Sequence, residues 1–63
     1  MERMGLVQGT REEIIRELDS LGADAARLGK TEKAREFARA IEAIKSGDGT
    51  VIVHKIRYDV LEG

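Results

Sequence analysis

The last fourteen residues, 50–63, constrain the fold of this chain more than any other segment. As one long strand, alternate positions would give two faces that both mix apolar and charged side chains. A two-residue turn at His54 and Lys55 separates these side chains, so that one face becomes wholly apolar or aromatic. That face carries Val51, Val53, Ile56, Tyr58 and Val60. A one-residue shift in register would expose the whole set, so the pattern predicts a β-hairpin over 50–61.

The proposed turn is chemically unusual. Two-residue hairpin loops favour Asn-Gly or Asp-Gly, because both central residues often need a positive φ angle. Histidine tolerates such angles better than most residues, whereas lysine is less suited to them. A longer loop, or a strand bent at His54, is therefore the alternative.

Two amphipathic helices are predicted before the hairpin. Thr10 and Glu13 have the spacing of a capping box, which starts the first helix, 10–29. Its apolar stripe consists of Ile14, Leu18, Leu21, Ala25 and Leu28. The stripe crosses Gly22, where a helix break is the alternative because glycine costs about 1 kcal/mol in a helix interior. Gly29 is predicted to end the helix.

The second helix is predicted over 31–46, with Thr31 as its N-cap. Its buried stripe consists of Ala34, Phe37, Ala38, Ile41 and Ile44. The short connection makes the two helices antiparallel neighbours. We therefore expect a single α+β domain, in which an antiparallel αα-hairpin packs on the C-terminal two-stranded β-hairpin. Residues 1–9 form either an arm or a short strand at Leu6-Val7 that extends the sheet.

The small size of the chain limits how it is stabilised. A 63-residue domain buries only about 60% of the surface that its unfolded chain exposes. The chain has no cysteine and no metal-ligating cluster, so its stability depends on helix packing or on oligomerisation. We therefore expect a homodimer.

The charge pattern argues against several kinds of partner. The net charge is -1 and 37% of the residues are charged, which gives a mixed-sign surface without general attraction to nucleic acid or anionic membranes. No apolar run approaches the roughly 20 residues of a membrane span, and the first residues lack the apolar segment of a signal peptide. We expect a cytoplasmic protein that does not bind membranes.

The sequence has no recognisable catalytic constellation. His54 is the only histidine. The sequence shows no set of nucleophile, base and orienting residue whose spacing would bring the three together. We interpret His54 as a solvated turn residue. We expect no enzymatic activity, cofactor, metal site or small-molecule substrate.

Residues 25–31 (AARLGKT) resemble the centre of a helix-turn-helix motif, in which a leucine and a glycine follow a small residue and precede the recognition helix. The resemblance implies that the first helix is interrupted at Gly22 and that the hairpin acts as a wing. It also implies phosphate contacts from Lys30, Lys33, Arg35 and Arg39. Glu32 and Glu36 interrupt this surface, and Arg35 replaces the branched apolar residue of the motif. A winged helix-turn-helix DNA-binding protein is the alternative function.

Apolar residues outside the predicted core favour protein binding. Ile15 lies off the stripe of its helix, Ile52 lies on the outer face of the hairpin, and Leu61 follows the hairpin. On so small a domain they predict a protein interface, with Arg57 and Tyr58 near its rim. The uncovered hairpin edge is a second candidate, through strand addition. We therefore expect a small intracellular interaction or regulatory module, of a kind that phages also encode, that binds a partner protein as a homodimer.

Overall fold

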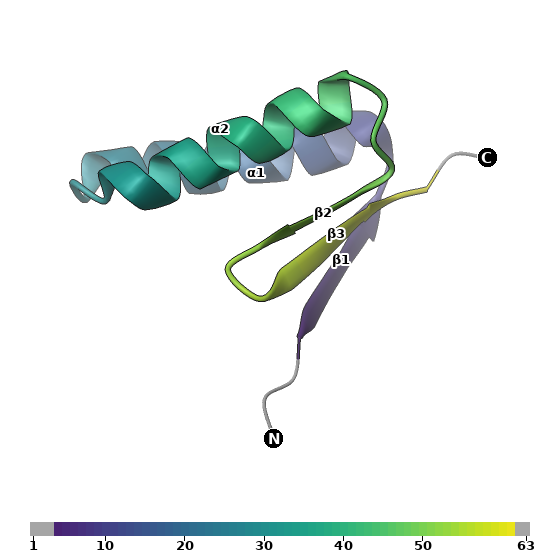
Figure 1. Cartoon of the computed structure of the whole chain (residues 1–63), viewed down its shortest axis with the longest axis horizontal. Helices are drawn as coiled ribbons and strands as arrows, with labels where there is room; N and C mark the ends of the chain where they lie inside the picture. Colours follow the sequence, from purple (N-terminus) through teal and green to yellow (C-terminus); the bar gives the residue numbers. More distant parts are fainter. Residues whose placement is uncertain (1–3, 62–63) are drawn as a thin grey trace.

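The computed structural model describes residues 4–61 and contains two helices and three strands. In chain order these are β1 (Gly5–Gly9), α1 (Arg11–Arg27), α2 (Thr31–Lys45), β2 (Thr50–Val53) and β3 (Ile56–Val60). The antiparallel helices form one layer and the strands form the other (Figure 1). The predicted α+β class, with an αα-hairpin packed on a β-hairpin, is confirmed.

The C-terminal hairpin has the predicted register. Val53 is opposite Ile56, and the pairing continues to Thr50 opposite Asp59. The two residues between the strands, His54 and Lys55, have φ angles of 50° and 64°. The two-residue turn is therefore confirmed, and the segment is neither a longer loop nor a bent strand.

The N-terminal segment forms a strand rather than an arm over Gly5–Gly9. This strand pairs parallel with β3, so the sheet order is β1-β3-β2. A two-stranded hairpin is marginal in water, and β1 provides the third strand that places β3 at the centre. The predicted arm or strand began at residue 1, but residues 1–3 lie outside the described range.

Helix α1 runs without a break through Gly22, so the predicted alternative of two shorter helices is wrong. The reason lies in the packing between the helices. A Cβ atom at position 22 would lie only 3.2 Å from Cβ of Phe37 on α2. Glycine thus allows the two helices to approach closely, which offsets its helix cost of about 1 kcal/mol.

Both ends of α1 have the predicted caps. The Thr10 hydroxyl accepts from the Glu13 N–H at 3.2 Å, and the Glu13 carboxylate accepts from the Thr10 N–H at 3.1 Å. The hydrogen bond from this N–H, with that from the Thr10 side chain, lowers the pKa of Glu13. At the other end, Gly29 has a φ angle of 76°, and the next N–H bonds back to Ala25 in a Schellman motif. The prediction of Thr31 as the N-cap of α2 is wrong, because Lys30 occupies that position without a side-chain cap.

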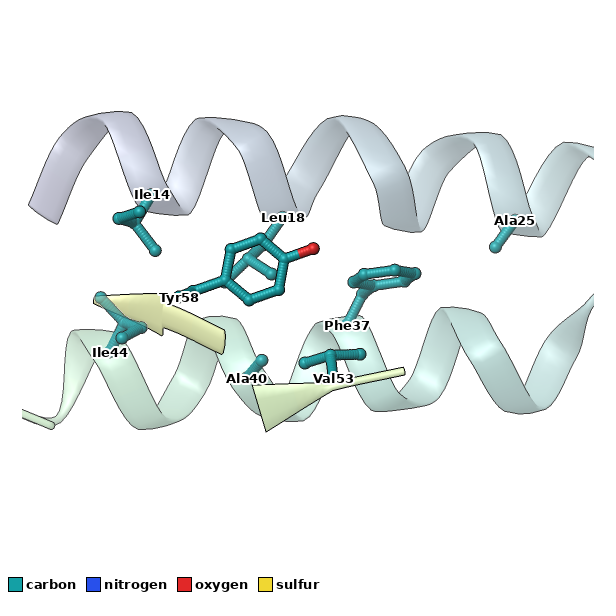
Figure 2. Packing of buried hydrophobic residues seen from close by; sticks show 8 residues of the cluster. All are labelled: Ile14, Leu18, Ala25, Phe37, Ala40, Ile44, Val53 and Tyr58. Atoms are coloured by element: carbon teal, nitrogen blue, oxygen red, sulfur yellow. The ribbon is translucent and has the colours of Figure 1, made fainter. Parts of the chain in front are cut away.

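The core lies between the helices and one face of the sheet (Figure 2). Its buried residues are Ile14, Leu18, Ala25, Phe37, Ala40, Ile44, Val53 and Tyr58. Two residues of the predicted stripes are exposed instead, namely Leu28 and Ala38. The helical hairpin projects beyond the turn of the β-hairpin, so the sheet does not cover Leu28 (Figure 1). Ala40 is buried in place of Ala38 because α2 turns this side toward β2.

Arg11 joins the start of α1 to the end of α2, a role that the sequence pattern does not reveal. Its half-buried guanidinium donates to the carbonyl of Ile44 and, at 3.3 Å, to that of Asp48. The last carbonyls of a helix have no partners within the helix and carry partial negative charge. The cation therefore stabilises the C-terminus of α2.

Candidate functional site

The helices cover only one face of the sheet, and no segment within residues 4–61 covers the other face (Figure 1). Because side chains alternate along a strand, the residues that pack against the helices identify the opposite set. Val7, Val51, Val53 and Tyr58 contact or belong to the core. The uncovered face therefore carries Leu6, Gln8, Thr50, Ile52, Arg57 and Asp59.

The register places Arg57 between two apolar neighbours on this face. Leu6 of β1 and Ile52 of β2 are both directly opposite Arg57 of β3. Both apolar side chains are well exposed, at 57% and 59%. The result is a row across all three strands in which one arginine separates two solvent-exposed aliphatic groups.

The two charged side chains of this face, Arg57 and Asp59, form an ion pair. Nε of Arg57 donates to Oδ1 of Asp59 at 2.9 Å, and the Thr50 hydroxyl donates to the same oxygen at 3.0 Å. The Arg57 hydrogen bond, with that of Thr50, holds the pKa of Asp59 below its ordinary value. The face therefore presents apolar groups around an internally neutralised ion pair.

Most of the exposed large apolar side chains in residues 4–61 gather on or beside this face. These side chains are Met4, Leu6, Leu28, Ile52 and Leu61. Met4 directly precedes β1, and Leu61 follows β3, where its N–H donates to the Gly9 carbonyl at 2.7 Å. Leu28 alone in this group lies at the far end of the helical hairpin. An apolar cluster of this kind marks interaction surfaces more often than isolated exposed residues do.

The structure brings together three of the five residues predicted at a protein interface. Ile52 and Arg57 are direct neighbours across strands, and Leu61 directly follows the strand that contains Arg57. Ile15 is half-buried on α1 and packs against the core, in the opposite layer. Tyr58 is buried in the core, so it cannot stand at the rim of a surface interface. Leu6 and Met4 were not predicted at the interface, because only the pairing of β1 with β3 places them here.

The burial of Tyr58 leads to a prediction about its ionisation. Burial, together with the negative charge of Glu17, raises the pKa of the phenol above its ordinary value of 10.0. Tyr58 is the only tyrosine and the chain has no tryptophan, so absorbance near 295 nm reports on this group alone. We expect an alkaline titration midpoint above 10.0.

The same shift links folding to pH. A pKa raised in the folded state means that the neutral phenol favours folding, so this contribution is complete below pH 10 and is lost as the pH rises through the folded pKa. In Tyr58→Phe the extra alkaline loss of stability should disappear, while the same lysines still titrate. A normal titration midpoint, or equal alkaline loss in both proteins, would contradict this assignment.

The four predicted nucleic-acid contacts all lie on exposed parts of α2 or at its start. They are Lys30, Lys33, Arg35 and Arg39. Arg35 and Arg39 line a shallow hollow that they share with Glu32 and Glu36, so this surface is mixed in sign. The continuous, antiparallel α1 lacks the break that the helix-turn-helix resemblance implies. DNA binding therefore stays a prediction without that geometric support.

His54 is an exposed turn residue, as predicted, and it also contacts α2. Its Nε2 lies 3.0 Å from Oε2 of Glu36, and its ring centroid lies 5.5 Å from that of Phe37. These contacts dock the tip of the hairpin on α2. Between residues 4 and 61, no three potential metal-ligating side chains are grouped together.

No helix in the described part of the chain has the length and apolar character that crossing a membrane requires. No protein family, curated protein or solved structure matches this chain.

Proposed function

We propose that this chain is a protein-interaction module, and that its uncovered sheet face binds a second copy of the chain. The observation that carries the proposal is the row of Leu6, Arg57 and Ile52 across the three strands. It exposes two aliphatic side chains on a face that no segment of residues 4–61 covers. A sheet normally buries its apolar face against another layer.

The charge arrangement favours a second copy over a strongly charged partner. Arg57 and Asp59 lie on the same face of the central strand and neutralise one another. A twofold axis that passes between Arg57 and Asp59 would set Arg57 of each copy opposite Asp59 of the other, because isologous interfaces pair a patch with itself. Two sheets packed about 10 Å apart would give a helix–sheet–sheet–helix sandwich.

The size of the face indicates a weak dimer. Stable interfaces bury about 800 Å² on each partner, whereas this sheet consists of three strands of four or five residues. We therefore expect a dissociation constant in the micromolar range, which corresponds to a binding free energy of about -8 kcal/mol. Such a dimer would exchange readily and would suit a regulatory module that also binds other proteins.

Sedimentation equilibrium of the whole chain at 5–500 µM, on the order of the expected dissociation constant, tests the proposal. Wild-type protein should pass from monomer to dimer across this range. Ile52→Asp should be monomeric throughout, because each interface would bury two uncompensated carboxylates. Leu28→Asp is the matched control, since it places the same charge at an exposed leucine far from the sheet. A monomer at every concentration, or equal effects of the two substitutions, would overturn the dimer.

A further inference from the structure

We propose that the free edge of β2 is a second binding site, which takes an extended, acidic segment of a partner protein as an added strand. The register identifies the backbone groups that are available. Val53 and Ile56 flank the two-residue turn, and the Val60 N–H donates to the Gly49 carbonyl at 2.8 Å. Alternation along an antiparallel pair then directs the N–H and C=O groups of Thr50 and Ile52 away from β3.

Apart from its short length, this edge lacks the features that usually block strand addition within residues 4–61, namely a charged side chain, a proline, a bulge or a covering segment. The four residues of β2 are TVIV, without charge or proline. Three of the four are valine or isoleucine, which favour the extended backbone that an added strand requires.

A groove runs beside the edge and would receive the side chains of the added strand. It has a volume of about 450 Å³. Glu36, Arg39 and Ala40 of α2 line one wall, and Val51, Ile52 and Val53 of β2 line the other. Ala40 contributes a small, buried side chain to the lining of this groove. Grooves between an edge strand and a helix are a known setting for peptide binding by strand addition.

The charges at the groove select the chemistry of the partner. Glu36 is engaged by His54 at 3.0 Å. Arg39 forms no ion pair with any residue in the range 4–61. A carboxylate on the added strand would complement Arg39, whereas the β2 strand of a second copy has no acidic residue to offer. The structure therefore favours a different, acidic partner at this edge.

The site does not depend on the dimer, because it uses the backbone of β2 and the flank of α2 rather than the uncovered face. The probe is an acetylated seven-residue peptide with the sequence Thr-Val-Thr-Glu-Thr-Val-Thr. In an extended conformation the two valines and the glutamate lie on the same side of this peptide, so all three can face α2 together. Titration calorimetry of the full chain should show saturable binding with a dissociation constant below about 1 mM.

Two substitutions at one position separate the backbone from the side chain. Proline is tolerated at an edge position whose N–H faces solvent, but it removes that donor. We expect Ile52→Pro to weaken peptide binding at least tenfold relative to Ile52→Ala, which loses the same side chain and keeps the N–H. Circular dichroism checks that both variants are folded.

A charge exchange at Arg39 keeps the proposal testable even if Ile52→Pro does not fold. Arg39 is exposed, so Arg39→Glu should leave the fold unchanged. This variant should lose the glutamate peptide and prefer the same peptide with lysine in place of glutamate. Absence of saturable binding to wild-type protein at millimolar peptide, or no reversal of preference in Arg39→Glu, would overturn the site. Sedimentation of the same samples reports separately on the dimer, so either proposal can fail without the other.

Discussion

Leu18→Ala should lower the free energy of unfolding by about 2–5 kcal/mol. Leu18 is 0% exposed and belongs to the same buried cluster as Tyr58. Removing its branched end loses the transfer free energy of the buried atoms and leaves a cavity between α1 and the sheet. A chain of 63 residues is stabilised by roughly 3–9 kcal/mol in total, so this single change should bring the protein near to global unfolding.

Urea denaturation followed by circular dichroism measures this effect. Leu28→Ala is the control, because it makes the same chemical change at a side chain that is 71% exposed. Its cost should stay within about 0.5 kcal/mol. Similar losses for the two variants would show that Leu18 does not occupy the position that the structure gives it.

Lys55→Gly should stabilise the protein by about 1 kcal/mol relative to Lys55→Ala. Lys55 has a φ angle of 64° in the turn between β2 and β3. This left-handed conformation costs an L-residue about 1–2 kcal/mol, and glycine avoids the cost. The greater entropy of glycine in the unfolded chain removes part of the gain.

The comparison with alanine isolates the backbone effect. Both substitutions lose the same lysine side chain and its interactions, so only the Cβ atom differs between them. Thermal and urea unfolding should both rank the glycine variant above the alanine variant. Equal stabilities, or the reverse order, would mean that position 55 does not hold a positive φ angle in solution.

The sequence predicted best those features in which neighbours along the chain decide the structure. The hairpin register followed from the position of apolar side chains on both sides of His54 and Lys55, nine residues or fewer from their partners. The caps of α1 likewise depend on Thr10, Glu13 and Gly29, each within the same turn as the groups that it satisfies. Local pattern and local hydrogen bonds point to the same conformation at these sites.

The predictions failed where two distant segments compete for the same residue. Judged from its sequence neighbours alone, Gly22 favours a helix break, but the close approach to Phe37 that it allows stabilises a continuous helix. Ala38 and Ala40 are equally apolar, and only the position of β2 beside α2 determines that Ala40 is the buried one. Leu28 fits the apolar period, yet the helical hairpin extends past the sheet and leaves it uncovered.

The candidate site shows the same division. Alternation along the hairpin was enough to place Ile52 and Arg57 on its outer face, because period two needs only the turn position. That face became a site only when β1 paired with β3 and brought Leu6 beside Arg57, fifty-one positions later in the chain. Sequence by itself determined the local elements, their caps and the hairpin register, since these depend on short-range geometry. Tertiary structure alone decided the third strand, the uncovered face and the groove beside β2, because each arises where segments remote in sequence pack together.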